Sequence, residues 1–207
     1  MSTTVSLRER KKQQTRYALE DTATKLVLER GLNQVTVEDI CAPVGVSKRT
    51  FFNYFAEKEE AILGTPPEKL GEQEKNLFLS TELELPEAVL TLMLTYVLGT
   101  DTTREWELYK RRHTIVEKHP ELHGFQRAYA LNWLREATTL IETYLVANPE
   151  KSATSLDPHY EAHTIANLAL SVIFASIHTS NTDMSTPQTF RDAAFHTLKS
   201  YRAILNH

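Results

Sequence analysis

The chain has 207 residues, of which 41% are hydrophobic and 24% are charged, with only 6 glycines and 8 prolines. This length exceeds what one small DNA-binding module needs, and the hydrophobic fraction excludes a disordered chain. Few runs of β-branched residues favour long helices, so we expect an all-α fold. The single cysteine, Cys41, excludes an intrachain disulfide, and no window reaches the ~18 apolar residues of a membrane span, so we expect a cytoplasmic protein without contact to a membrane.

The charge is distributed unevenly along the sequence. A formal net charge of -4 argues on its own against binding to a polyanion. The first sixteen residues nevertheless contain five basic residues and only one acidic residue. The basic residues are Arg8, Arg10, Lys11, Lys12 and Arg16. Such local charge suits a molecule that offers one end to phosphate, although a solvated tail is the alternative.

Two helices are predicted before residue 45. The first covers residues 14–30, where apolar positions follow the 3/4 helical spacing and Gly31 ends the pattern. The second covers residues 36–44 and begins with a capping-box variant made by Thr36 and Asp39. It is barely two turns long.

A third helix follows a glycine turn. Gly45 breaks the second helix, and Ser47 can cap a helix that runs through Tyr54. Two short helices around a glycine are typical of a helix-turn-helix, whose second helix enters the major groove of DNA, although an ordinary helical hairpin with a solvated polar face is the alternative. The polar residues left outside the apolar stripe are Ser47, Lys48, Arg49, Thr50 and Asn53.

The run TVEDICAPVGVSKRTFFNYFAEKEEAIL resembles the DNA-binding domain of the tetracycline-repressor (TetR) family, and the preceding LEDTATKLVLERGL resembles the first helix of that family. The resemblance covers about residues 8–64. It implies that Lys48, Thr50 and Asn53 approach bases or phosphates. It also implies that Tyr54 packs against the DNA backbone and that Lys58 meets a phosphate. The complete set of expected DNA-binding residues is Thr36, Ser47, Lys48, Arg49, Thr50, Asn53, Tyr54 and Lys58.

Three residues depart from the family pattern. Pro43 lies in the last turn of the second helix and cannot donate a backbone hydrogen bond there, so we expect a slightly deformed turn. Arg49 stands where the family often has glycine or alanine, and it either contacts DNA or is solvated. Glu57 replaces a common capping serine, and its carboxylate suits a helix N-terminus but not a neighbouring phosphate.

The resemblance to the TetR family implies that residues 65–207, which follow the helix-turn-helix domain of residues 1–64, form a helical bundle that dimerises and binds a ligand. The stretch 65–86 reads as an irregular connector with some helix at 70–79. With the three N-terminal helices, the pattern predicts about nine helices in total. The later predicted helices cover residues 87–98, 103–118, 121–147, 158–180 and 187–205.

Dimerisation is predicted through the last two helices. The stretch IANLALSVIFASIH is apolar around most of its circumference, and the last helix carries a matching stripe. A homodimer with two-fold symmetry would place two recognition helices one DNA turn apart and read a palindromic operator in double-stranded DNA. The alternative is that the stripe is buried within one subunit. Its residues are Phe190, Ala194, Leu198, Tyr201 and Leu205.

A ligand cavity would be lined by apolar residues with a few polar groups, and many helices could provide one. The RTFFNYF and RRHTIVEKHPELHGFQR segments resemble an actinobacterial subgroup linked to acyl-CoA or lipid metabolism, which implies a small apolar or amphipathic effector, acyl-CoA or lipid-like. Each candidate has burial in the core or exposure at the surface as its alternative. The candidates are Trp106, Tyr109, His113, Phe125, Tyr129, Trp133, Asn167, Ser171, Phe174 and His178.

Enzymatic chemistry has little support in the sequence. The pairs His119/His123 and His159/His163 have the spacing of metal ligands on one helix face, but neither has the HExxH order. No phosphate loop or nucleophile motif is present, so we expect no catalytic residue, metal or cofactor. Together with the helix-turn-helix pattern, the resemblance to the TetR family implies a DNA-binding transcriptional repressor released by a ligand. The alternatives are a regulator or activator without a ligand and a helical metal-dependent hydrolase.

Overall fold

The computed structural model describes residues 6–64, 70–98, 103–154, 157–178 and 185–205. This part of the chain contains helices and no strand, which confirms the all-α class. It holds ten α-helices where about nine helices were predicted. They are α1 (Leu7–Arg30), α2 (Val37–Val44), α3 (Lys48–Phe52), α4 (Lys58–Leu63), α5 (Glu72–Leu79), α6 (Leu85–Leu98), α7 (Thr103–Lys118), α8 (His123–Ala147), α9 (Pro158–His178) and α10 (Pro187–Leu205), with short 3-10 helices η1 (Leu32–Gln34), η2 (Pro120–Leu122) and η3 (Pro149–Lys151).

The chain divides into two compact units. The N-terminal unit consists of Met1–Pro66 and Glu107–Tyr129, and the C-terminal unit consists of Pro67–Trp106 and Ala130–His207. The first division lies close to the expected boundary after residue 64. The sequence pattern gave no sign that residues 107–129 pack with the N-terminal helices.

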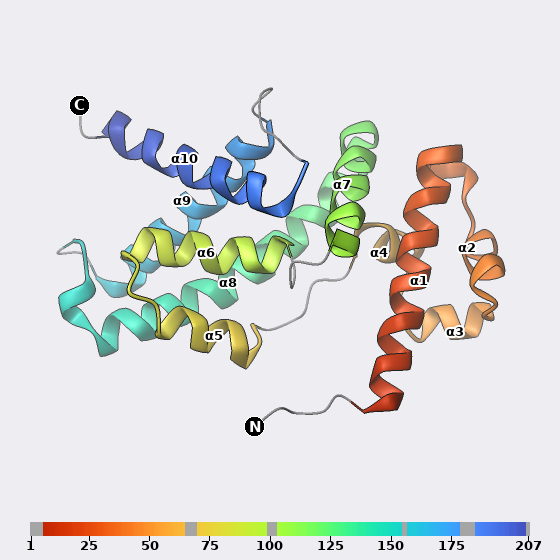
Figure 1. Cartoon of the computed structure of the whole chain (residues 1–207), viewed down its shortest axis with the longest axis horizontal. Coiled ribbons are helices and arrows are strands. Elements are labelled where there is room, and N and C mark those ends of the chain that lie inside the picture. Colours follow the sequence, from red (N-terminus) through yellow and green to blue (C-terminus); the bar gives the residue numbers. More distant parts are fainter. Residues whose placement is uncertain (1–5, 65–69, 99–102, 155–156, 179–184, 206–207) are drawn as a thin grey trace. The chain divides into compact units, whose positions relative to one another are not determined.

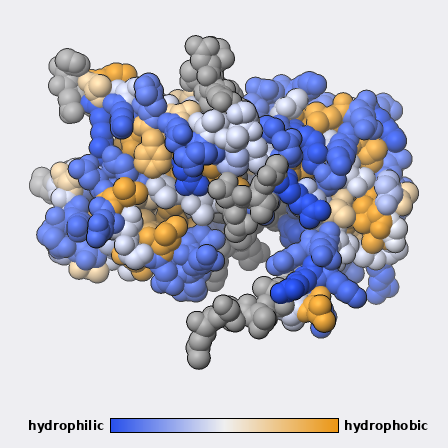
Figure 2. Space-filling view, viewed as in Figure 1, coloured by the Kyte–Doolittle hydropathy of each residue, from blue (hydrophilic) through white to orange (hydrophobic). Residues whose placement is uncertain are grey.

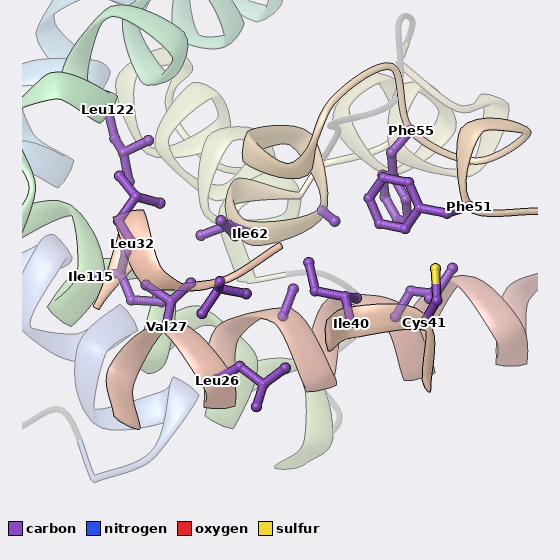
Figure 3. Packing of buried hydrophobic residues seen from close by; sticks show 14 of the residues in the cluster. Leu26, Val27, Leu32, Ile40, Cys41, Phe51, Phe55, Ile62, Ile115 and Leu122 are labelled. Carbon is purple, nitrogen blue, oxygen red and sulfur yellow. The ribbon is translucent and has the colours of Figure 1, made fainter. Parts of the chain in front are cut away.

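The N-terminal unit is built on α1, which packs against α2 and α4, while α2 packs against α3 (Figure 1). Its core takes side chains from each of these helices and from the returning segment (Figure 3). Burying such side chains stabilises the unit by about 1.5–3 kcal/mol each. The buried residues are Leu19, Ala23, Leu26, Val27, Leu32, Val35, Ile40, Cys41, Phe51, Phe55, Ala61, Ile62, Ile115, Val116 and Leu122.

Local hydrogen bonds start and stop the two short helices as the sequence predicts. Thr36 caps α2: its hydroxyl accepts from the Asp39 backbone N–H, and the Asp39 carboxylate accepts from the Thr36 N–H at 2.9 Å. Hydrogen bonds from Thr36 lower the pKa of Asp39. Gly45 ends α2 in the left-handed conformation, with φ 73°, which glycine adopts without steric cost.

The observed boundaries differ from the predicted ones at α1 and α3. Helix α1 begins at Leu7 rather than at residue 14, because its first turns are polar and basic and give no apolar periodicity to detect. Helix α3 ends at Phe52, since the Asn53 N–H already bonds in the tighter pattern of a helix terminus. The end predicted for α9 at residue 180 lies outside the described residues.

In the C-terminal unit, α6 packs against α5, α9 and α10, and α9 packs against α10 (Figure 1). The apolar stripe predicted to face a second copy is buried instead: Phe190 and Ala194 are fully buried and Leu198 is 2% exposed. The Phe190 ring lies 5.9 Å from that of Trp106. For these three residues the alternative of burial within one subunit is correct, because the neighbouring helices cover them. Tyr201 is half-buried, and the Leu205 side chain lies outside the described part.

The surface shown in Figure 2 is mainly hydrophilic, with hydrophobic residues in small separate patches. None of the described helices is both long enough and apolar enough to cross a membrane.

Glu161 anchors the start of α9. Its carboxylate, in a residue only 2% exposed, accepts from the Ser152 hydroxyl at 2.5 Å, the Ala153 N–H at 2.7 Å and the Thr154 hydroxyl at 2.9 Å. Burial works against the charged form, but these donors outweigh burial and hold the pKa of Glu161 below its ordinary value. The carboxylate therefore stabilises the fold at neutral pH.

Replacing Glu161 with glutamine is expected to lower the stability of the C-terminal unit by about 1–3 kcal/mol at pH 7, because the buried donors lose a charged acceptor. A depressed folded-state pKa gives stability above the unfolded-state pKa that is lost as pH falls through the folded-state value. The difference between wild type and variant should therefore shrink in acid. Urea unfolding at pH 7 and pH 3 measures it. Glu150→Gln, at an exposed acid of η3 just before the donor residues, should show no such difference.

Candidate DNA-binding site

Helix α3 begins with a hydroxyl cap that ties two of the expected site residues together. The Ser47 hydroxyl accepts from the Thr50 backbone N–H at 3.1 Å and lies 2.9 Å from the Thr50 hydroxyl. This pair fixes the first turn of α3, which carries the exposed cations Lys48 and Arg49. Asn53, at the C-terminal end of the helix, is exposed as well. One short helix thus presents two positive charges and an amide. These are groups of the kind that contact phosphates and base edges in DNA.

Phe52 is a feature of this surface that the sequence pattern missed. Of the three phenylalanines in and just after α3, only Phe51 and Phe55 are buried, and Phe52 is 53% exposed. Its ring meets that of Phe51 edge to face at 5.5 Å. A helix of five residues has too few turns for periodicity to decide which neighbouring aromatic points outward.

The remaining expected residues are already engaged in the fold. The Thr36 hydroxyl belongs to the cap of α2, and Tyr54 is partly buried against the core. The Lys58 ammonium donates to the Leu32 carbonyl at 2.9 Å and to the Val35 carbonyl at 3.1 Å. These two bonds tie the start of α4 to η1, and an ammonium has only one further donor for another partner.

Replacing Lys58 with methionine is expected to cost the N-terminal unit about 1–3 kcal/mol, because two partly buried carbonyls lose a charged donor. Lys48→Met should change stability by less than about 0.5 kcal/mol, since the Lys48 side chain is exposed and its ion pair with Glu38 lies on the surface. Thermal unfolding followed by circular dichroism distinguishes the two variants. Equal unfolding temperatures would show that the carbonyl bonds of Lys58 contribute nothing.

Pro43 and Glu57, which differ from the TetR family pattern, have small effects on the structure near α2 and α4. Despite Pro43, the Gly45 N–H bonds to the Cys41 carbonyl at 3.0 Å and the Val46 N–H bonds to the same oxygen at 3.2 Å, so the turn closes. Glu57 precedes α4 without capping it through its side chain. The Glu60 carboxylate accepts from the Ala56 N–H at 2.6 Å instead.

The basic residues before position 17 belong to α1 rather than to a tail. Because α1 begins at Leu7, Arg8, Arg10, Lys11 and Lys12 lie on its first turns and are exposed. Arg16 pairs with Glu20 at 3.2 Å, and its guanidinium carbon lies 5.1 Å from the centre of the Phe55 ring. The first turns of α1 thus form a cluster of positive charge on the surface of the N-terminal unit.

Two arginines of α7 join α1 within the same unit. Arg111 pairs with Asp21 at 2.5 Å, and Arg112 pairs with Glu20 at 3.1 Å. Arg112 also donates to the Ile62 carbonyl of α4 at 3.2 Å. Burial works against the charged form of Asp21, but hydrogen bonds from Lys25 and Arg111 outweigh it and lower its pKa.

The ten expected ligand residues do not gather at one place. Tyr109, His113, Phe125 and Tyr129 belong to the N-terminal unit, and Phe125 packs against its core. Burial, followed by the charges of Glu60 and Glu57, raises the pKa of Tyr129. In the C-terminal unit, the structure describes two buried tryptophans, three exposed residues of α9, and a helix-ending histidine whose side chain lies outside the described part: Trp106, Trp133, Asn167, Ser171, Phe174 and His178.

Two adjoining cavities lie elsewhere in the C-terminal unit, and neither is lined by an expected ligand residue. The first, of about 240 Å³, has mainly apolar walls made by Glu74, Leu77, Phe78, Thr81, Leu83, Ala88, Thr91, Leu92 and Thr95. The second, of about 410 Å³, shares Phe78, Thr81, Leu83 and Ala88 with the first. It adds the acidic residues Glu82, Glu84 and Glu150 and the basic residues Lys151 and Arg202. The weak periodicity of residues 65–86 left this region without candidates in the sequence.

The histidine pairs do not form a metal centre in the described residues. The rings of His159 and His163 lie 4.7 Å apart, and His159 Nδ1 lies 2.9 Å from a Glu142 carboxylate oxygen. His119 Nδ1 lies 3.2 Å from a Glu121 oxygen. Within the described part of the chain, no group of three or more His, Cys, Asp or Glu side chains is placed to hold a metal ion.

Residues 19–63, which hold this helix-turn-helix, match the family model described as bacterial regulatory proteins, tetR family. The chain is also 24% identical, over 163 residues, to a protein of Mycobacterium tuberculosis named as a mycofactocin biosynthesis transcriptional regulator, MftR. That match covers 78% of this chain and 79% of MftR. The helix-turn-helix of this chain is thus similar to that of the tetR family of bacterial regulatory proteins.

Two further comparisons concern the N-terminal sequence and the fold. Over 66 residues the chain is 46% identical to the HTH-type transcriptional regulator TcmR of Streptomyces glaucescens, a match that covers 32% of this chain and 29% of TcmR. The fold is similar to that of NalD, the secondary repressor of the MexAB-OprM multidrug efflux pump in Pseudomonas aeruginosa, with a TM-score of 0.57 and 19% identity. That alignment covers 91% of this chain and 95% of NalD. The sequence matches are to regulators of transcription, and they identify this chain as a DNA-binding regulator of transcription.

Proposed function

We propose that the chain is a dimeric repressor that leaves its operator when an amphipathic ligand binds the C-terminal unit. The observation that carries the proposal is the exposed surface of α3, where Lys48, Arg49 and Asn53 follow a fixed hydroxyl cap. Residues 1–64 would bind DNA, and residues 65–207 would dimerise and bind the ligand. A regulator of this kind works where the chromosome is, so the proposal places it in the bacterial cytoplasm.

The DNA-binding surface would combine base contacts from α3 with phosphate contacts from α1. Asn53 has the amide that pairs with adenine, and the exposed Phe52 ring can contact a thymine methyl group. Arg8, Lys11 and Lys12, on the first turns of α1, supply charge for phosphates. The edges of this surface would be formed by hydroxyl-bearing residues that lie close to helix starts or to the core. They are Ser47, Thr36 and Tyr54.

The dimer would form through the exposed side of α9 together with α10. Phe174 is 47% exposed and Tyr160 is 69% exposed, although both lie on a helix whose other side is buried. Exposed residues recur on α9 at intervals of three or four positions, as one helix face requires. They are Tyr160, His163, Thr164, Asn167, Ser171 and Phe174.

A charge placed on this face should separate the dimer. Phe174→Glu is expected to shift the protein from dimer to monomer, because each subunit of a two-fold dimer brings one new negative charge into the interface. Sedimentation velocity measures the change. Leu131→Glu, at a residue of α8 that is 57% exposed, serves as the matched control and should leave the dimer intact. Dissociation by both variants, or by neither, would contradict the proposed interface.

The ligand would occupy the two adjoining cavities of the C-terminal unit. The apolar walls of the first suit a hydrocarbon chain, and the charged residues of the second suit a polar head group. In the second cavity Arg202 is already paired with Glu87 at 2.6 Å, while Lys151 is exposed. An apolar cavity beside a charged one supports an amphipathic effector, and the resemblance of the sequence to a subgroup linked to acyl-CoA metabolism makes a long-chain acyl-CoA the first compound to test.

Selection of bound sequences from a random DNA pool tests the proposal. A palindrome with half-sites one helical turn apart is the expected result. Addition of palmitoyl-CoA should then weaken operator binding about tenfold, whereas free coenzyme A, which lacks the acyl chain, should not. Failure to enrich any sequence contradicts operator binding. An operator affinity that palmitoyl-CoA leaves unchanged contradicts an acyl-CoA effector.

A further inference from the structure

A carboxylate lies on the surface that this regulator presents to a polyanion. Glu38, in the first turn of α2, is ion-paired through a carboxylate oxygen with the Lys48 ammonium at the start of α3. The side chains of Glu38 and Lys48 are 56% and 54% exposed, so neither charge is needed to compensate a buried partner. Near phosphates, such a carboxylate weakens binding to DNA of any sequence. Its place beside Lys48 therefore calls for a function in recognition.

We propose that the Lys48–Glu38 ion pair reads one G·C base pair in each half-site of the operator. This inference rests on the proposed function, in which α3 enters the major groove. The guanine edge there offers the acceptors N7 and O6, and the cytosine edge offers the N4 amino donor. The ammonium donates to guanine O6 and N7 while the carboxylate accepts from cytosine N4. The two side chains together thus match both bases of one pair.

The spacing of the groups agrees with this arrangement. Guanine O6 and cytosine N4 are hydrogen-bonded to each other, at a separation of about 2.9 Å. An ammonium and a carboxylate in an ion pair lie at about the same separation, 2.7–2.9 Å. The two atoms of the protein pair can therefore lie beside the two atoms of the base pair. A single lysine contacts guanine alone and leaves the cytosine amino group without a partner.

The same geometry rejects the other base pairs. An A·T pair in the same orientation turns the adenine N6 amino group toward the ammonium and thymine O4 toward the carboxylate, so donor meets donor and acceptor meets acceptor. A C·G pair exchanges the two groups, with the same result. A T·A pair keeps an acceptor and a donor in these two places, but the thymine C5-methyl group stands where guanine has N7, so the ammonium loses its second hydrogen bond and meets an apolar group. Substitution of this one base pair should weaken operator binding about tenfold or more. Glu38 would thus be a specificity-determining residue, although it adds negative charge to the surface.

Selection from a random DNA pool with four proteins tests the inference: wild type, Glu38→Gln, the charge-reversed double variant Glu38→Lys/Lys48→Glu, and Glu29→Gln as a control for loss of an exposed acid in the same unit. The wild-type motif should contain one G·C position that Glu38→Gln relaxes while leaving the other positions unchanged. Glu38→Gln should also bind random-sequence DNA several-fold more tightly. The reversed pair should select C·G at the same position, and Glu29→Gln should keep the wild-type motif.

The outcomes separate this inference from the proposed function. If wild type enriches no motif, operator binding fails and the inference fails with it. If wild type enriches a palindrome that Glu38→Gln leaves unchanged at every position, operator binding stands and the inference is overturned. Selection of the wild-type base pair by the charge-reversed variant overturns it as well, because the orientation of the ion pair would then have no effect on the base that is read.

Discussion

Replacing Phe51 with alanine is expected to destabilise the N-terminal unit by about 3–5 kcal/mol. The Phe51 ring is fully buried and lies 5.3 Å from the ring of Phe55 in the core that includes α1, α2 and α4. Its removal leaves a cavity that the surrounding helices can only partly close. Since domains are stable by about 5–15 kcal/mol, the loss is a large share of the total, and DNA binding should fail as the recognition helix loses its support.

The two tryptophans of the chain make this prediction measurable. Trp106 and Trp133 both belong to the C-terminal unit, so their fluorescence reports the unfolding of that unit, whereas far-ultraviolet circular dichroism reports the helices of both. In Phe51→Ala, part of the circular dichroism signal should be lost at lower urea than the fluorescence change.

Phe52→Ala is the matched control, because the neighbouring ring is 53% exposed. Its stability should stay within about 0.5 kcal/mol of wild type. If the two alanine variants unfolded at the same urea concentration, the assignment of Phe51 to the core and Phe52 to the surface would be wrong.

Arg112→Met is expected to cost the N-terminal unit about 2–4 kcal/mol, because it removes the donor for two partly buried acceptors. The guanidinium pairs with Glu20 at 3.1 Å and donates to the Ile62 carbonyl at 3.2 Å. It also lies against Gly64, whose φ is 75° and where an added Cβ would come within 2.5 Å of Arg112 Cζ. The methionine side chain fills much of the same space but donates no hydrogen bond.

The neighbouring Arg111→Met separates this effect from the loss of any positive charge. Asp21, the partner of Arg111, keeps its bond to Lys25 at 2.8 Å, so we expect a cost below about 1 kcal/mol. Urea unfolding followed by circular dichroism measures both variants. If Arg111→Met and Arg112→Met lowered the free energy of unfolding equally, the contacts of Arg112 with α1 and α4 would contribute no extra stability. A larger loss for Arg112→Met would identify it as the residue that fastens α7 to both helices.

The residues that line a ligand cavity could not be predicted from the sequence. Aromatic and polar residues of the later helices were chosen for their chemistry, but in a helical bundle the lining of a cavity depends on how helices distant in sequence pack together. The first cavity is lined instead by α5, α6 and their connection, where residues such as Leu77 and Thr91 carry no chemical signature of a site, and the second adds residues of α8, η3 and α10. The buried stripe of α10 has the same explanation, because periodicity identifies an apolar face but not the partner that covers it.

The sequence alone determined the elements that depend on contacts within three or four residues. Thr36 with Asp39, Gly45 and Ser47 define the helix-turn-helix through caps and a left-handed turn, and these interactions need no distant partner. Only the tertiary structure decided that Phe51 is buried and Phe52 exposed, and that Lys58 bonds to carbonyls 26 and 23 positions away. It also decided that residues 107–129 return to the N-terminal unit. Such pairings depend on the path of the whole chain, because burial against distant helices has no fixed spacing in the sequence.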